Sequence, residues 1–476
     1  MPLEYDLFAF RRGTITAPAG CGKTQIIADT LIQHAGAKPV LILTHTNAGV
    51  STLRLRMQRG NVPSSAYRIT TLDGFAMRLV GTFPERSGIS PGILQLRSPG
   101  TDYPAIRQAA CQLVQGGHLN ETLAASYVHL IVDEYQDCNL VQHALVTAIA
   151  ATLPTCVLGD PMQAIFGFGG NQLVDWNAHV LPQFPLIGEL SHPWRWINAG
   201  TAALGQWLLH CRHVLSAGGN IDLRQAPAEV TWVQLLVGTV DHQRLVAART
   251  AAVTAWGQVL VIGDSRNPRG RRQMASQTPG ATAVEPVDWT DLTTFGLLFN
   301  LGAADALTRL VHFAGELMTQ VGVAALLARL ESLLRGTARN PPTLAEAALL
   351  AFAAGPSFPL AENALRALTR QDNARVFRPE ILRGCIRAMQ IAAGGGCSFA
   401  EATIRERERN RHESRPLARR SIGSTLLLKG LEAEVAVIPT PETMDAKHLY
   451  VAMTRGSARL VVCSATPELV PLPPGR

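Results

Sequence analysis

The chain has 476 residues, of which 47% are hydrophobic and 17% are charged, and a formal net charge of +7 at pH 7. This length predicts two or three domains, and this composition excludes a disordered chain. We expect neither a membrane span nor a signal peptide, because no long uninterrupted apolar run is present. The eight cysteines form no CxxC pair, which disfavours a zinc site or a disulfide framework and fits a cytoplasmic protein. The positive charge is compatible with a polyanionic partner.

The first part of the chain alternates between strand-like and helix-like segments, which predicts a parallel sheet. The predicted segments are strands at 14–17, 39–44 and 69–72 and helices at 23–35 and 47–59. Residues 81–125 break the alternation with Gly, Pro and Ser clusters before a helical piece, so we interpret them as a small insertion. Strands are expected again at 127–132 and 155–159.

A second α/β unit is expected to begin at about 185–195. Its predicted strands are 257–263 and 434–438, and a mostly helical insertion separates them. Capping boxes, in which a hydroxyl and a carboxylate satisfy the first turn of a helix, are predicted at Thr343–Glu346 and Ser398–Glu401. The predicted limits are 1–80 and 126–188 for the first lobe, 81–125 for its insertion, 189–289 and 396–476 for the second lobe, and 290–395 for the helical insertion.

Residues 17–24 read Ala-Pro-Ala-Gly-Cys-Gly-Lys-Thr and stand between a predicted strand and a predicted helix. Backbone N–H groups at such a helix start surround an anion, Lys23 adds a positive charge for the β- and γ-phosphates, and the Thr24 hydroxyl reaches Mg²⁺. Ala17 stands where the first glycine of such loops is usual, and a plain strand-to-helix turn is the alternative interpretation. The residues predicted to contact nucleotide here are Ala19, Gly20, Cys21, Gly22, Lys23, Thr24 and Gln25.

Residues 133–137 read Asp-Glu-Tyr-Gln-Asp and follow an apolar run. Ligands bind at the carboxyl ends of parallel strands, so this acidic cluster is expected beside the phosphate loop. Asp133 is predicted to hold Mg²⁺, and Glu134 to orient and deprotonate the attacking water. A solvated acidic turn is the alternative. Together the two clusters predict hydrolysis of a nucleoside triphosphate.

Six further strings occur in the order typical of one family. They are LTHTNAG at 43–49, ITTLDGF at 69–75, LGDPMQAIFGF at 158–168, LSHPWRWI at 190–197, LKGLE at 428–432 and LYVAMTRG at 449–456. With them, the chain resembles the UvrD/Rep-like superfamily 1A DNA helicases. The resemblance implies an α/β fold of two RecA-like parallel-sheet lobes, with a small insertion in the first and a helical insertion in the second.

The resemblance also implies roles for residues of both lobes around ATP and Mg²⁺. Gln163 would sense the γ-phosphate, and Arg195 would reach it from the second lobe. Trp194 would stack on adenine, Glu432 would meet the ribose, and Arg455 would act as the arginine finger. The residues expected to touch single-stranded DNA are Thr46, Asn47, Thr71, Phe75, Phe166 and Phe168.

The chain departs from the family pattern at three places. Asp73 and Leu426 stand where histidines are usual, and no glutamine precedes the phosphate loop. Adenine selectivity therefore lacks its usual residue. The tract from Arg405 to Arg420 carries seven arginines, which we interpret either as a solvated surface or as a contact for phosphate or a partner.

These features predict an ATP-dependent translocase or helicase on single-stranded DNA, with 3′→5′ polarity implied by the resemblance. One alternative is a DNA-stimulated motor subunit that unwinds little by itself. Such a subunit resembles the compact helicase of Gabija-type anti-phage systems, whose partner is an OLD-family nuclease. A degenerate ATP-binding scaffold is the alternative from another class, and the joint presence of Lys23, Glu134 and Arg455 argues against it.

Overall fold

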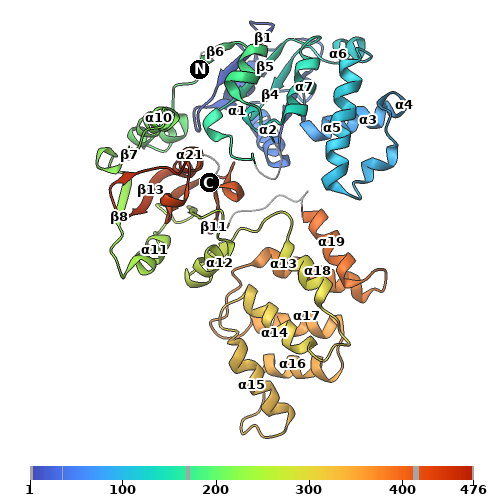
Figure 1. Cartoon of the computed structure of the whole chain (residues 1–476), viewed down its shortest axis with the longest axis vertical. Coiled ribbons are helices and arrows are strands. Elements are labelled where there is room, and N and C mark those ends of the chain that lie inside the picture. Colours follow the sequence, from blue (N-terminus) through green and yellow to red (C-terminus); the bar gives the residue numbers. More distant parts are fainter. Residues whose placement is uncertain (1–3, 35, 168–171, 411–417, 474–476) are drawn as a thin grey trace.

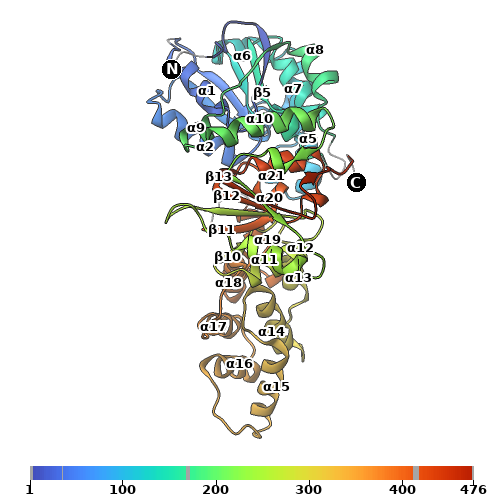
Figure 2. The ribbon, with the colours of Figure 1, turned by 90° about the vertical axis from the view of Figure 1, so that its left-hand side faces the viewer.

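The computed structural model describes residues 4–34, 36–167, 172–410 and 418–473. The molecule is elongated, with two sheet-containing lobes and a helical unit stacked along its long axis (Figures 1 and 2). Among the described residues, no helix combines the length and the apolarity that a bilayer crossing requires.

The first lobe contains a six-stranded parallel sheet with the order β3-β2-β4-β5-β1-β6. Every residue of β2 and β5 is buried, as expected of a parallel sheet that helices cover on both faces. The strands are β1 (Arg12–Thr16), β2 (Val40–Thr44), β3 (Tyr67–Thr71), β4 (Leu130–Val132), β5 (Thr155–Gly159) and β6 (Leu186–Glu189). The main helices of this lobe are α1 (Lys23–Ile32), α2 (Asn47–Arg59), α3 (Leu72–Thr82) and α7 (Leu140–Ile149).

Between α3 and β4 the chain forms a small helical cluster. It consists of α4 (Pro84–Ser87), a 3-10 turn (Pro91–Gln95), α5 (Pro99–Gln115) and α6 (Asn120–Ser126). Helix α5 packs against α3 and α7, so this segment shares a hydrophobic core with the first sheet. After β5, the short helical turns are Pro161–Gln163, Trp176–Val180 and α8 (Leu181–Gln183).

The second lobe contains another six-stranded parallel sheet, with the order β10-β11-β9-β12-β13-β8. Its strands are β8 (Val230–Gln234), β9 (Val259–Gly263), β10 (Ala281–Ala283), β11 (Arg420–Ser424), β12 (Ala433–Ile438) and β13 (Gly456–Ser464). Its helices are α9 (Trp194–Asn198), α10 (Ala202–Ser216), α11 (Val240–Ala248), α12 (Pro268–Gln277), α20 (Thr425–Leu428) and α21 (Ala446–Met453), and β7 (Ile221–Asp222) pairs with β14 (Glu468–Leu469). The predicted α/β fold with two parallel-sheet lobes is confirmed.

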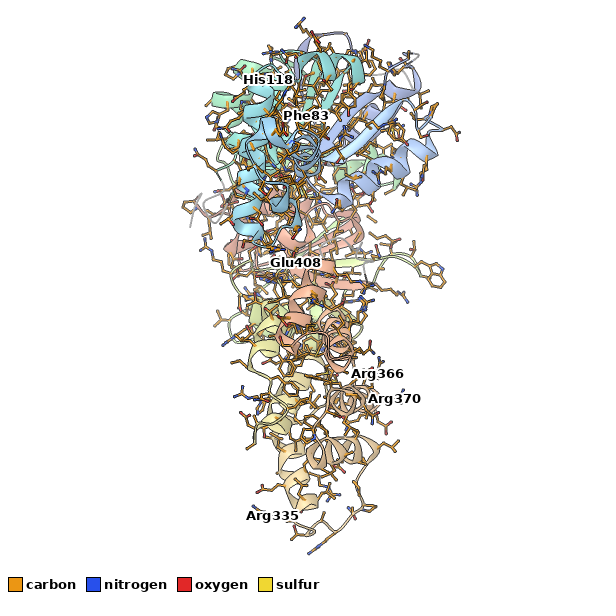
Figure 3. All side chains as sticks on the ribbon, turned by 90° about the vertical axis from the view of Figure 1, so that its right-hand side faces the viewer. Phe83, His118, Arg335, Arg366, Arg370 and Glu408 are labelled. Atoms are coloured by element: carbon orange, nitrogen blue, oxygen red, sulfur yellow. The ribbon has the colours of Figure 1, made fainter. Side chains whose placement is uncertain are left out.

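A helical unit stands between β10 and β11 in the chain and has a hydrophobic core of its own. Its helices are α13 (Thr290–Leu298), α14 (Ala306–Leu317), α15 (Val323–Leu334), α16 (Leu344–Ala354), α17 (Phe358–Thr369), α18 (Pro379–Ala393) and α19 (Phe399–Asn410). Figure 3 shows Arg335 at the far end of this unit and Phe83 and His118 at the opposite end of the molecule. Both predicted capping boxes are present, at the starts of α16 and α19.

A buried ionic contact anchors the helical unit to the second sheet. The Arg378 guanidinium, 1% exposed, donates to both carboxylate oxygens of Glu285 at 2.6 and 2.8 Å and to Asp291. Glu285 is 2% exposed and follows β10 closely in the chain. Paired guanidinium and carboxylate groups are the arrangement in which charges tolerate burial.

Three strand boundaries differ from the sequence prediction for local reasons. Leu72 starts α3 because the Thr71 hydroxyl accepts the Gly74 N–H at 2.9 Å and caps the helix. The strand expected at 127–132 begins at Leu130, since the Tyr127 N–H is bound by the end of α6. The strand expected at 257–263 begins at Val259, because a turn that Gly257 closes comes first.

Candidate nucleotide site between the two lobes

The phosphate loop joins β1 to α1 and lies beneath two tryptophans of α9. Gly20 and Gly22 have φ values of 72° and 88°, a region that side chains other than glycine rarely adopt. A Cβ atom at Gly20 would lie 2.5 Å from the Trp196 ring, and one at Gly22 would lie 3.0 Å from Trp194. Both glycines are therefore required by the backbone conformation and, at Gly20, by the close approach of the second lobe. Ala17 is buried and extends the register of β1, donating its N–H to Gly159 at 2.8 Å.

Lys23 lies between the two carboxylates of the acidic cluster. Its Nζ is 3.2 Å from Asp133 Oδ1 and donates a hydrogen bond to Glu134 Oε1. Burial acts to lower the pKa of Lys23, but the charges of Asp133 and Glu134 outweigh burial and raise it. Asp133 is 4% exposed. The structure thus places the Lys23 ammonium and the buried Asp133 carboxylate together at the end of β4, joined by an ion pair.

Glu134 is held in a strained conformation by a glutamine of the same cluster. Its φ is 57°, in the left-handed region, a feature that is common at functional sites. Gln136 donates to Glu134 Oε2 and accepts the Asp160 N–H at 3.0 Å. Burial alone would raise the pKa of Glu134, but the charges of Lys23 and Lys429 lower it to about 2. Glu134 is therefore ionised at neutral pH and fixed in orientation.

Gln163 is positioned by a buried ion pair that the motifs did not predict. Its amide donates to Asp160 Oδ2 at 3.1 Å, and Asp160 is fully buried. Arg212 of α10 donates through Nε to Asp160 Oδ1 at 3.0 Å and through Nη1 to Glu189 Oε1 at 2.7 Å. The sequence did not predict this ion pair, because Arg212 is a single arginine within α10 and belongs to no recognisable motif.

The second lobe brings Arg195, Glu432 and Arg455 to the same cleft. The Arg195 backbone N–H donates to Gly20 O at 3.1 Å, and its guanidinium pairs with Glu432 and donates to Thr454 O at 2.6 Å. Arg455 is 3% exposed and donates to the Val451 carbonyl at 2.9 Å. Burial, followed by the neighbouring charge of Arg195, lowers the pKa of Arg455 to about 10.

Two further contacts tie the lobes together directly. The Ala19 N–H donates to the Tyr450 hydroxyl at 3.1 Å. Lys429 Nζ donates to both carboxylate oxygens of Asp137, at 2.6 and 2.7 Å, and to the Gln163 carbonyl at 2.5 Å. Burial raises the pKa of Asp137 to about 6, although Lys429 acts to lower it. Lys429 Nζ also lies 4.6 Å from the centroid of the Phe166 ring.

The residues predicted to touch DNA are divided between surface and core. Thr46 and Asn47 are exposed at the start of α2, where the Thr46 hydroxyl accepts the Gly49 N–H at 3.0 Å. Thr71 is half-buried and caps α3, and Phe166 is half-buried beside the lobe contact. Phe75 is 1% exposed and packs in the core of the first lobe, so its side chain offers no face to a base. Phe168 lies outside the described residues.

Gln25 and Asp73, which the sequence motifs single out, bind partners within the first lobe. Gln25 donates to Asp29 at 2.6 Å and accepts from Arg56 at 2.9 Å, which links α1 to α2. Asp73, which replaces the family's usual histidine, accepts two hydrogen bonds from Arg107 of α5 at 2.6 and 2.7 Å. The change from histidine to aspartate therefore fastens the small insertion to α3.

Trp194 and Thr24 complete the predicted nucleotide set. Trp194 is half-buried beside Gly22, and its ring stacks on His192 with centroids 5.6 Å apart. Thr24 is half-buried in the first turn of α1. No group of three metal-ligating side chains exists within the described ranges.

Residues 99–175 match the UvrD/REP helicase N-terminal domain family. Over these residues the chain is similar to the UvrD/REP helicases. A "probable DNA helicase" of Mycoplasma pneumoniae (strain ATCC 29342 / M129 / Subtype 1) is 33% identical to the present chain over 88 residues. These residues are 18% of the present chain and 15% of the Mycoplasma protein. The predicted resemblance to the UvrD/Rep-like proteins is thereby confirmed.

Among solved structures, one titled "Complex structure of Arterivirus nonstructural protein 10 (helicase) with DNA" is similar to the present chain. The alignment covers 96% of the present chain and 63% of the arterivirus chain. The sequence identity is 9% and the TM-score is 0.36. The chain thus covers less than two thirds of either protein.

Proposed function

We propose that the chain is an ATP-driven translocase of the UvrD-like helicase type that moves 3′→5′ on single-stranded DNA. The observation that supports this best is the docking of second-lobe residues on the phosphate loop. The Arg195 backbone donates to Gly20, and its guanidinium holds Glu432 beside Arg455. Such a site is complete only when both lobes contribute, so occupancy of the site and the relative position of the lobes are linked.

The residues at the end of β4 fit a bound Mg²⁺–ATP. Asp133 is buried, and the Lys23 ammonium lies 3.2 Å from its Oδ1 atom, so this carboxylate already faces a positive charge, as a buried carboxylate requires. Thr24 and Asp133 would hold the Mg²⁺, which supplies charge neutralisation at the β- and γ-phosphate oxygens. Lys23 binds the carboxylates of Asp133 and Glu134 in this structure. When nucleotide binds, Lys23 would give up one of these carboxylates for a phosphate oxygen.

The protein groups then divide the work of hydrolysis. Glu134, ionised and oriented by Gln136, accepts a proton from the attacking water. Gln163, held through Asp160, contacts the γ-phosphate, and Arg455 stabilises the charge that develops on it. Trp194 supplies a ring for adenine beside Gly22, in place of the missing upstream glutamine.

Coupling to DNA is proposed to pass through Lys429. This residue joins the second lobe to Asp137 of the acidic cluster, to the Gln163 backbone and to the face of Phe166. A base that stacks on Phe166 therefore acts on the same contact that holds the lobes together. Thr46, Asn47 and Thr71 would contact the strand elsewhere on the first lobe.

We further propose that the chain translocates better than it unwinds by itself. Its first insertion, apart from the 3-10 turn 91–95, consists of α4, α5 and α6. Helix α5 is fixed by the Asp73–Arg107 pair and by packing, so little of the insertion is left to engage a duplex. A partner subunit, such as an OLD-family nuclease, would then supply what the chain lacks.

Translocation along single-stranded DNA tests the main proposal. The purified chain is preloaded on oligonucleotides that carry a fluorophore at the 3′ or the 5′ end, and ATP is added in a stopped-flow instrument. We expect a lag that grows with oligonucleotide length only when the label is at the 5′ end. Length-independent kinetics at both ends would contradict translocation, and a lag at the 3′ end would reverse the polarity.

A further inference from the structure

The turn that precedes β9 presents a tryptophan to solvent. Trp256 is 89% exposed, Val253 is 55% exposed, and Ala255 between them is also exposed. Ala255 and Trp256 are the central residues of a β-turn that the Gly257 N–H closes on the Thr254 carbonyl at 3.1 Å. Single exposed apolar residues are ordinary, but tryptophan is the residue type most enriched among those that dominate protein–protein binding.

The turn is held rigidly from beneath. The Glu434 carboxylate, at the start of β12, accepts the Thr254 N–H at 2.9 Å and the Thr254 hydroxyl. A Cβ atom at Gly257 would lie 1.9 Å from Glu434 Oε2, so any larger residue there would displace the carboxylate that holds the turn. Arg419 donates to the Ala255 carbonyl at 2.6 Å. Because the backbone is already ordered, little conformational entropy remains to be lost when the indole binds.

The surroundings of the turn are basic. Arg419 and Arg249 are exposed, and the half-buried Arg420 donates to the Thr250 carbonyl at 3.0 Å. Among the described residues, the hydrogen bonds of these three arginines go to backbone carbonyl oxygens, which carry no full negative charge. The acidic side chain in contact with the turn is Glu434, whose carboxylate is already bound; its pKa is lowered by the hydrogen bonds from Thr254. An apolar centre within a positive rim is complementary to an apolar pocket with an acidic rim.

We propose that Trp256, Val253 and Ala255 form the centre of a docking surface for an acidic protein partner, whose pocket receives the indole and whose carboxylates face Arg249 and Arg419. A protein fits better than a nucleic acid, because a base would stack on Trp256 but would gain nothing from Val253. The residues proposed to contact DNA, such as Thr46 and Phe166, belong to the other lobe.

A photo-crosslink from the full chain identifies the partner. Val253 is replaced by p-benzoylphenylalanine, which leaves the Trp256 anchor in place, and the cross-linked species is identified after irradiation in cells. The identified protein is then purified and its Kd for the chain is measured. We expect Trp256→Ala to weaken binding at least tenfold, about the loss typical of an anchor residue, and Trp256→Phe to weaken it less.

Two further variants separate the surface from general effects. Arg419→Glu should weaken binding, and reversal of the facing carboxylate to lysine in the partner should restore it. Val237→Ala is the matched control, since Val237 is fully exposed at the other end of α11 and should leave Kd unchanged. The proposal is overturned if the cross-link goes to DNA or to a second copy of the chain, if no species is captured, or if Trp256→Ala leaves Kd unchanged or weakens binding of single-stranded DNA.

Discussion

Replacement of Lys429 by methionine should loosen the contact between the two lobes. The Lys429 and Asp137 side chains are 7% and 4% exposed, so both charges are buried in the contact. Removal of one partner from a buried pair costs about 3–5 kcal/mol, because the remaining charge is left without compensation. At about 1.4 kcal/mol per factor of ten, this corresponds to roughly a 100- to 4,000-fold increase in local opening.

The acidity of Asp137 limits this effect at lower pH. Burial raises its pKa to about 6, so without Lys429 the carboxyl group can avoid part of the cost by binding a proton. The full effect is therefore expected near pH 8, where the carboxyl group is ionised. Lys429→Met combined with Asp137→Asn should recover most of the loss, since no charge is then left unpaired.

Hydrogen–deuterium exchange of peptides that cover residues 133–138 measures this opening at the lobe contact. Arg309→Met is the matched control, because its pair with Asp305 is 42% and 49% exposed and is worth about 0–1 kcal/mol. If exchange at 133–138 rises less than tenfold in Lys429→Met, or if the double variant exchanges as fast as the single one, the buried pair does not hold the lobes together.

Four further outcomes are expected. Burial raises the pKa of Asp137 to about 6, so protonation of this group favours the folded, closed state; that contribution should be lost as pH rises through about 6, seen as a thermal midpoint that falls with pH and that Asp137→Asn makes less dependent on pH. Arg212→Met leaves fully buried Asp160 unpaired and should destabilise the fold by about 3–5 kcal/mol, seen as a lower thermal midpoint, whereas Arg309→Met should not. Trp194→Ala should raise KM for ATP about 10–100-fold with a smaller change for Trp194→Phe, and equal KM values would exclude stacking. Glu134→Gln should lower kcat by about 10²–10⁴ at unchanged nucleotide affinity, and a smaller loss would exclude a general base.

Seven of the twelve strands in the two six-stranded sheets, and the position of the acidic cluster, could be predicted because their signals are local, whereas β6, β8, β10, β11 and β13 were not predicted. The strand at 155–159 was predicted at its observed limits, as five consecutive residues that are all buried. The two capping boxes were predicted for the same reason, since a hydroxyl and a carboxylate three residues apart interact within one turn.

The features that the sequence did not predict depend on contacts between distant residues. Arg212 and Asp160 are 52 residues apart, and nothing near either residue indicates the other. The burial of Phe75 depends on which face of α3 meets the core, and the motif alone does not show this. The display of Trp256 depends on Glu434, which fixes the preceding turn from another strand.

The rate of ATP hydrolysis by the purified chain, with and without single-stranded DNA, tests the central claim most directly. We predict that single-stranded DNA raises the turnover rate and that Lys23→Ala abolishes turnover under both conditions, because the lobe contact and the nucleotide site share the same residues. A turnover rate that DNA leaves unchanged would contradict a DNA-driven motor, and a turnover that survives Lys23→Ala would contradict the nucleotide site itself.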